Sequence, residues 1–102
     1  MERTTMYAIY FETKVYFGDK PIGDTIELSD PDIIPAANDE EAIKRAFERA
    51  ELIEYLKSLR LSNKASNKKI LARVRAVVRM EQNKDIVIHT PKYKRGDFKA
   101  RA

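Results

Sequence analysis

The chain of 102 residues has no cysteine and a single histidine, and these absences exclude much of the chemistry that proteins use. Without cysteine, disulfides, thiolate nucleophiles and cysteine-ligated zinc sites are ruled out. His89 would need catalytic partners that the spacing of the sequence gives no reason to expect, and a histidine in this setting is more often a packed or surface residue. We therefore expect no nucleophilic active site.

Glycine is almost as scarce, with three residues in the whole chain. None of them has the spacing of a dinucleotide-binding or phosphate-binding loop. Acidic residues are plentiful, and one group near a predicted strand end would suit a hard cation such as magnesium, although solvated turn residues are the commoner explanation: Asp24, Glu27, Asp30 and Asp32. We expect a protein that is not an enzyme and that holds no cofactor and no metal ion.

Long hydrophobic runs are missing too. No segment reaches the roughly 20 apolar residues that a membrane-spanning helix needs. The N-terminus begins with mostly polar residues, and Glu12 and Lys14 interrupt the apolar stretch that follows, so nothing there has the pattern of a signal peptide. With 43% hydrophobic and 35% charged residues, the chain is predicted to be a soluble cytoplasmic protein with one domain and no membrane contact.

A long helix over 38–61 is the best-defined element. Asn38 is suited to accept a hydrogen bond from the first turn, and Glu41, three residues later, to return one, as in a capping box. Apolar residues then recur at spacings of three and four and form one stripe for a sheet to cover: Ile43, Ala46, Phe47, Ala50 and Ile53. A second apolar set lies almost on the opposite side of the helix: Leu52, Tyr55, Leu56 and Leu59.

Because one helix face cannot hold both sets, the sequence leaves two arrangements open. Either the helix breaks near Glu51, or its second half is covered on another side by the C-terminal segment or by a partner subunit. The second set is therefore a candidate interface, with a cover from within the chain as the commoner solution.

Residues 5–17 alternate between apolar and mixed polar side chains, which is typical of a half-buried strand. A turn at 18–21 leads to a second, antiparallel strand over about 24–28. We interpret residues 33–37 as an extended lead into the helix, since Pro35 limits regular structure there.

Residues 70–80 fit two periodicities. As a strand, with a period of two, they would have one apolar face. As a helix, they would have an apolar stripe as well. We favour the strand because valine and isoleucine are frequent in it and because the turn-like segment 81–84 leads directly to another strand over 85–90. The two strands then make a second hairpin.

The expected fold is α+β, with an antiparallel sheet of about four strands in ββαββ order, or ββααβ if residues 70–80 are helical, and the long helix packed on one face. Residues 1–90 form the domain, and residues 91–102 form a basic C-terminal tail. The segment 33–47, IIPAANDEEAIKRAF, resembles the passage from an extended segment into a helix in many small α+β proteins, the archaeal ribosomal protein LX family among them. The resemblance rests on the capping signal and assigns no functional residue.

Charge divides the chain near Ser62. Residues 1–61 hold 8 Lys/Arg and 13 Asp/Glu, whereas residues 62–102 hold 12 and 3. Such a division is typical of a surface for nucleic acid, of an acidic protein partner or of self-assembly, unless folding interleaves the two halves.

The basic half holds the candidate binding residues. As a strand, residues 70–80 would place Arg73, Arg75 and Arg79 on one face, where their guanidinium groups can meet successive phosphates. The alternative is a solvated face paired with acidic residues of the helix. The neighbouring loop and the tail would add cations and two aromatic rings suited to stacking on unpaired bases: Lys68, Lys69, Lys92, Tyr93, Lys94, Arg95 and Phe98.

The leading prediction is a non-enzymatic protein that binds nucleic acid or a nucleoprotein through phosphates, largely without sequence readout. The alternative is a structural, assembly or inhibitor protein, for instance a viral one, that forms a homo-oligomer or docks on another protein. Its contact would combine the acidic helix with the apolar surface of Leu52, Leu56 and Leu59.

Overall fold

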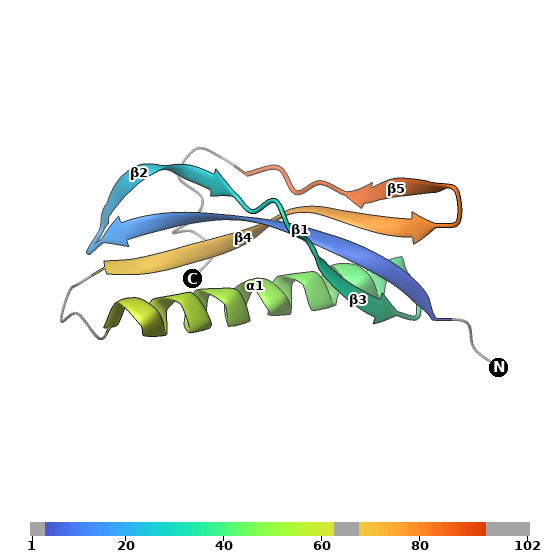
Figure 1. Cartoon of the computed structure of the whole chain (residues 1–102), viewed down its shortest axis with the longest axis horizontal. Helices are drawn as coiled ribbons and strands as arrows, with labels where there is room; N and C mark the ends of the chain where they lie inside the picture. The colour runs from blue at the N-terminus through green and yellow to red at the C-terminus, as the bar shows by residue number, and fades with distance from the viewer. Residues whose placement is uncertain (1–3, 63–67, 94–102) are drawn as a thin grey trace.

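The computed structural model describes residues 4–62 and 68–93. It has the predicted α+β fold, with an antiparallel sheet and one helix packed on it, and the predicted ββαββ order is present with one further strand before the helix (Figure 1). The elements in chain order are β1 (Thr5–Phe17), β2 (Lys20–Glu27), β3 (Asp32–Ala36), α1 (Asp39–Ser62), β4 (Lys68–Glu81) and β5 (Lys84–His89). The strand interpretation of residues 70–80 is thereby confirmed.

Strand β1 is the centre of the sheet. One of its edges pairs with β4 along almost its whole length, from Tyr7 to Phe17. Its other edge is shared, because β2 pairs with the second half of β1 and β3 with the first half. Strand β5 then pairs with the last part of β4, so that the sheet order is β2-β1-β4-β5 with β3 beside β1.

The sequence interpretation of residues 33–37 missed β3. Pro35 lies in this strand opposite Met6, and Ile34 lies opposite Tyr7 and is buried. A proline is tolerated there because β3 is an edge strand with one hydrogen-bonded neighbour, so that the missing N–H need not break a ladder. The extended lead into the helix is therefore part of the sheet.

The start of α1 follows the predicted capping box. The Glu41 N–H donates to Asn38 Oδ1 at 2.9 Å, and Glu41 Oε2 accepts a hydrogen bond from the Ala37 N–H at 3.3 Å. The returning bond thus reaches one residue beyond the cap. Asp39, Glu40 and Glu41 place negative charge in the first turn, where it interacts favourably with the helix dipole.

The core lies between α1 and the sheet. Helix α1 presents a row of fully buried alanines, Ala42, Ala46 and Ala50, and small residues let the helix lie close to the strands. The sheet contributes the large buried side chains: Tyr7, Ile9, Phe11, Val74 and Val77. The other predicted stripe residues flank the alanine row and are partly buried: Ile43, Phe47 and Ile53.

Helix α1 also covers the edge of β4 that β5 leaves open. Strand β5 pairs only with Val77 to Glu81 of β4, so the backbone groups before Val77 need other partners. Ser58 Oγ accepts from the Ile70 N–H and donates to the Ile70 carbonyl, both at 3.3 Å. Glu54 Oε1 accepts from the Ala72 N–H at 2.8 Å, and these bonds protect the strand edge.

Replacement of Ser58 by alanine measures how much these hydrogen bonds to the edge of β4 contribute to stability. Ser58→Ala removes two partly buried hydrogen bonds and is expected to lower the free energy of unfolding by about 1–2 kcal/mol. The measurement is urea unfolding followed by circular dichroism. Ser29→Ala, in the exposed bend after β2, is the matched control and should stay within about 0.5 kcal/mol of the parent protein. Equal losses from both changes would contradict the edge role of Ser58.

Candidate functional site

A bulge in β4 decides where its arginines point. Tyr10 pairs with Ala76, but the next residue, Phe11, pairs with Val74, so Arg75 is an extra residue in β4. A bulge shifts the alternation of side chains between the two faces of a sheet. Residues of β4 before and after Arg75 therefore follow different alternations.

The predicted row of three arginines on one face is wrong for this reason. Arg79 pairs with Tyr7, whose side chain lies in the core beside α1. Arg73 pairs with Glu12, which lies on the other face of β1 because it is an odd number of residues from Tyr7. We call the face that carries Glu12 and Arg73 the open face, because α1 packs on the opposite one.

On the open face, Arg73 is held by a carboxylate and an aromatic ring. Its Nε lies 2.6 Å from Glu12 Oε1, and the two side chains are only 15% and 13% exposed. The Arg73 guanidinium carbon lies 4.2 Å from the centroid of the Tyr93 ring. The Tyr93 hydroxyl donates to the Val74 carbonyl at 2.8 Å, which fixes the ring against β4. Arg73 and Tyr93 are therefore oriented by contacts within the chain.

Arg75 is placed by a second aromatic contact. Its guanidinium carbon lies 5.1 Å from the centroid of the Tyr10 ring, within the range of a cation–π interaction. The Nε atom is buried and has no hydrogen-bond partner in residues 4–62 and 68–93. The guanidinium is thus oriented by an aromatic ring, with no ion pair of its own in that part of the chain.

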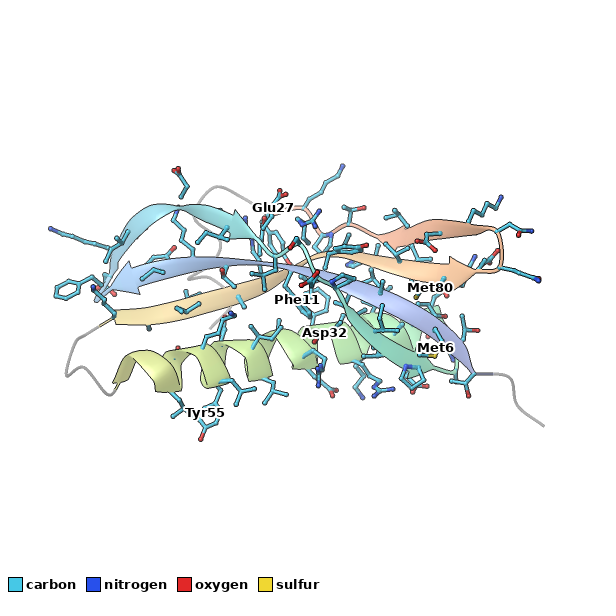
Figure 2. The ribbon with its side chains drawn as sticks, in the orientation of Figure 1. Met6, Phe11, Glu27, Asp32, Tyr55 and Met80 are labelled. Carbon is cyan, nitrogen blue, oxygen red and sulfur yellow. The ribbon has the colours of Figure 1, made fainter. Side chains whose placement is uncertain are left out.

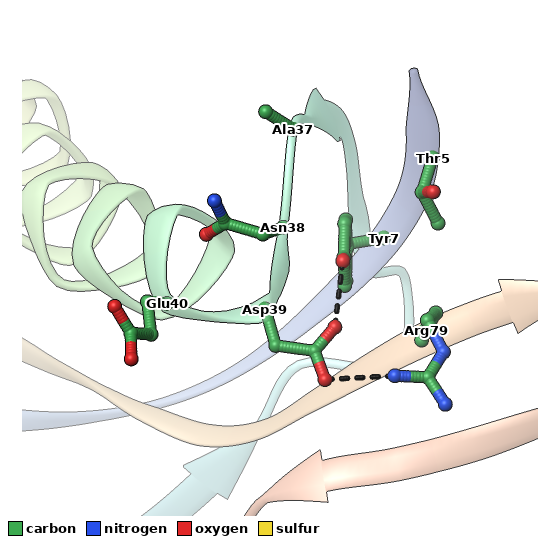
Figure 3. Close-up of a pocket in the computed structure, with 7 residues that line it drawn as sticks. All are labelled: Thr5, Tyr7, Ala37, Asn38, Asp39, Glu40 and Arg79. Atoms are coloured by element: carbon green, nitrogen blue, oxygen red, sulfur yellow. Dashed lines mark hydrogen bonds and ion pairs between the residues drawn. The ribbon is translucent and has the colours of Figure 1, made fainter. Parts of the chain in front are cut away.

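Arg79 lies in a polar cluster at the start of α1. Arg79 Nη1 is 2.7 Å from Asp39 Oδ2, and Arg79 Nε is 2.9 Å from Glu81 Oε1. The Tyr7 hydroxyl donates to Asp39 Oδ1 at 2.7 Å, so both oxygens of this carboxylate are occupied (Figure 3). Tyr7, Asp39 and Arg79 line a shallow polar depression together with Thr5, Ala37, Asn38 and Glu40. Its ionic groups satisfy one another, which is typical of a structural cluster.

The cluster changes the pKa values of its members. The hydrogen bond from Tyr7 is the largest cause that lowers the pKa of Asp39, with partial burial opposing it and Arg79 adding to it. Burial, followed by the hydrogen bond to Asp39, raises the pKa of Tyr7 to about 12. Asp39 therefore favours its charged form and Tyr7 its neutral form in the folded protein.

Replacement of Tyr7 by phenylalanine tests this cluster through pH. Tyr7→Phe should lower the free energy of unfolding by about 1 kcal/mol at pH 7, because the bond to Asp39 is lost. The contribution of Tyr7 is fully present below its unfolded pKa of about 10 and is lost as pH rises through its folded pKa of about 12. The difference between parent and variant in urea unfolding should therefore shrink across this range. Tyr55→Phe, at an exposed position, should change the free energy of unfolding of the monomer by less than about 0.5 kcal/mol at pH 7.

A cluster of cations occupies one end of the open face. Lys14 of β1 pairs with Leu71, which lies between Lys69 and Arg73 on β4. Residues two apart on a strand share a face and lie about 6.6 Å apart, so the three cations are neighbours. We call Lys14, Lys69 and Arg73 the basic end of the open face. Neighbouring like charges destabilise a sheet by up to about 1 kcal/mol, and a bound anion relieves that repulsion.

The analysis of the sequence missed Lys14 because it belongs to another strand and to the acidic half of the chain. Only the pairing of β1 with β4 brings it beside Lys69 and Arg73. Of the other predicted cations, Lys68 and Lys92 are exposed. Lys94, Arg95 and Phe98 lie outside the described residues.

The other end of the open face is apolar. Pairing places side chains from four strands there, and all are exposed: Met6, Ile33, Met80 and Val87. The open face thus has two chemically different ends. Figure 2 labels Met6 and Met80 at the end of the sheet farthest from the β1–β2 turn.

The second apolar set on α1 is exposed as well. The helix continues through Glu51 without a break, which excludes one of the two arrangements that the sequence left open. Leu52, Tyr55, Leu56 and Leu59 are 42%, 62%, 51% and 46% exposed. Figure 2 shows Tyr55 projecting from α1 on the side away from the sheet. We call these four residues the outer face of α1.

His89 has a packing role in the structure, as the sequence favoured. It pairs with Val77 on β4, and its ring meets the Phe47 ring edge-on at 6.1 Å between centroids. Asp32, one of the four acids considered for a cation, is the first residue of β3 and forms an ion pair with Arg49 at 2.9 Å. Within residues 4–62 and 68–93, no three His, Asp or Glu side chains gather as a metal site would require.

Among the described residues, α1 is too polar to cross a membrane. Comparison of the chain with protein-family models, with curated proteins and with solved structures gives no match.

Proposed function

We propose that this chain is a non-enzymatic protein that binds nucleic acid, or a nucleoprotein, through its phosphates and largely without reading the base sequence. The observation that carries the proposal is the basic end, where β1 and β4 bring Lys14, Lys69 and Arg73 together on a face that α1 leaves uncovered. Lysine and arginine at such spacing suit the successive phosphates of a nucleic acid strand.

The proposal changes the roles of the three arginines. Arg79 is not part of the proposed interface, because it lies on the helix side of the sheet, opposite Tyr7. Arg73 and Arg75 contribute through guanidinium groups that Tyr93 and Tyr10 already orient, so little side-chain entropy is lost on binding. Lys14 and Lys69 supply cations with no ion pair among the described contacts.

Tyr93, the last described residue, lies at the same face as the basic end. It is anchored to the Val74 carbonyl and packs against Arg73. Lys94, Arg95 and Phe98 remain candidate contacts on the strength of their sequence alone, as cations and a ring interleaved for phosphate and base contacts.

Fluorescence anisotropy with labelled single-stranded and double-stranded oligonucleotides, titrated at several salt concentrations, tests the proposal. The variant Lys14→Gln/Lys69→Gln should bind about tenfold more weakly, and the slope of log affinity against log salt should fall by about two. The matched control is Lys44→Gln/Lys84→Gln, which removes the same charge from exposed positions on α1 and at the β4–β5 turn. The control should keep most of the affinity.

A chain that ends at Tyr93 tests the tail separately, because it keeps the Tyr93 contacts with β4. Reduced affinity with a smaller salt slope would assign phosphate contacts to the tail. Absence of binding by the full chain at low salt, or equal losses from the two double variants, would reject the basic end as a nucleic-acid site.

A further inference from the structure

We propose that the outer face of α1 is the contact between two copies of this chain, packed antiparallel across a two-fold axis. This contact lies on the side of the molecule opposite the open face, and it does not depend on the proposed function. It gives a definite form to the self-association that the sequence left as an alternative.

The spacing of the outer face is self-complementary. Positions 52, 55, 56 and 59 are symmetric about the midpoint between 55 and 56, so the pattern reads the same from either end of the helix. In an antiparallel pair centred there, Leu52 faces Leu59 of the second copy, while Tyr55 and Leu56 each meet their own counterparts. A two-fold contact requires a self-complementary surface, and the i, i+3, i+4, i+7 spacing of this helical stripe meets that requirement.

The amount of apolar surface agrees with a reversible dimer. From their exposed fractions, the four side chains offer on the order of 400 Å² per copy. Two copies would then bury about 800 Å² in all, and the aliphatic stems of Arg45 and Arg49 next to the patch would add to this area. This is below the roughly 1,000 Å² of a stable specific interface, so the dimer is of the weak, transient class, with association in the micromolar range or above.

The charges on α1 do not favour assembly through contact between the acidic part of one copy and the basic part of another, which the uneven charge of the sequence suggested. The exposed side of α1 before Leu52 is mixed, since Glu41 and Glu48 alternate with Lys44 and Arg49. Beyond the acidic first turn, residues 44–59 of α1 hold four cations and three acids, so this part of the helix offers no acidic surface to attract the basic end of another copy. Apolar burial is left as the driving force, and the contact should be insensitive to salt.

Sedimentation equilibrium of the nuclease-treated full chain, from about 10 μM to 1 mM and at low and high salt, tests the dimer. The average mass should rise from one chain toward two at both salt concentrations. Leu56→Glu should raise the dimer dissociation constant by at least about tenfold, because it places two carboxylates at the centre of the contact. Val87→Glu, which adds the same charge at the exposed apolar end of the open face, should leave the association unchanged.

Disulfide trapping tests the antiparallel geometry, because the chain has no cysteine of its own. In a mixture of Leu52→Cys and Leu59→Cys chains under mild oxidation, the mixed disulfide should exceed either disulfide between identical chains. A monomeric mass at every concentration, a dimer that high salt dissociates, or a dimer weakened equally by Val87→Glu would overturn the proposal. Preferential crosslinking of Leu52→Cys chains to one another would overturn the antiparallel arrangement. Circular dichroism of each variant checks that the fold is retained.

The dimer also has a consequence for binding, and this part rests on the proposed function. Because the contact uses the side of α1 away from the sheet, both open faces stay accessible and two basic ends are presented by one particle. Two linked sites bind a long strand more tightly than either site alone. Leu56→Glu should therefore weaken binding to a long oligonucleotide but not to a short one. Equal effects on both lengths would reject this avidity while leaving the dimer itself untouched.

Discussion

Phe11→Ala is expected to lower the free energy of unfolding by about 3–5 kcal/mol, a large share of the stability of a domain this size. Phe11 is 1% exposed and lies at the middle of β1, opposite Val74 and next to the β4 bulge. Figure 2 labels it where β1 passes over α1. Truncation to alanine leaves a cavity that neighbouring strands, fixed by their pairing on both edges of β1, cannot close.

Urea unfolding measures this loss. Phe17→Ala, at the end of the same strand, is the matched control because Phe17 is 48% exposed, and its loss should stay below about 1 kcal/mol. Similar losses at the two positions would mean that the core does not lie between β1 and α1. A drop in the urea dependence of the unfolding free energy, rather than in the midpoint alone, would show that the variant has lost its single cooperative transition.

The strand that holds Phe11 is one of the elements that the sequence predicts correctly. The alternation over 5–17 and the capping box at Asn38 predict β1 and α1 almost to the residue, since both signals are local. The predicted stripe on α1 is confirmed: Ala46 and Ala50 are fully buried and the larger stripe residues flank them, but the prediction omitted Ala42, which is buried in the same row. A small residue gives no strong periodic signal, although it decides how closely the helix approaches the sheet.

Errors arose where a tertiary neighbour overrides a local signal. Strand β3 was interpreted as a lead because Pro35 argues against regular structure, and only its place at an edge makes the proline acceptable. The bulge at Arg75 carries no glycine or proline to mark it, so a regular alternation put all three arginines on one face. Which face each arginine occupies follows from its pairing with β1, and a single strand does not contain that information.

Folding partly interleaves the two electrical halves of the chain. Glu12 of the acidic half pairs with Arg73 of the basic half, and Asp39 pairs with Arg79. The sequence raised this possibility but placed all the acidic partners on the helix, whereas Glu12 lies in β1. The same pairing that neutralises those arginines leaves Lys14 beside Lys69, and so creates a cationic site in which one member comes from the acidic half.

Glu12→Ala carries the second large expected effect, a loss of about 3 kcal/mol of unfolding free energy. The Arg73 side chain is only 15% exposed, so removal of Glu12 leaves a nearly buried guanidinium without the carboxylate at 2.6 Å. The Tyr93 ring at 4.2 Å compensates for part of that loss through a cation–π interaction. Glu27→Ala, at the exposed cross-strand neighbour of Glu12, should change the stability by no more than about 0.5 kcal/mol.

A double variant distinguishes the contribution of the Glu12–Arg73 ion pair from that of side-chain packing at the same positions. Glu12→Leu/Arg73→Met replaces both charges by apolar side chains and should recover most of the stability lost in Glu12→Ala, because no buried charge is left unpaired. Urea unfolding of Glu12→Leu, of Arg73→Met and of the double variant gives the coupling energy between the two residues. If the double variant is as unstable as Glu12→Ala, then Glu12 acts through contacts other than Arg73. Nucleic-acid affinity of the same double variant then reports on the Glu12–Arg73 pair as a unit, and a stable fold means that a loss of affinity is not caused by unfolding.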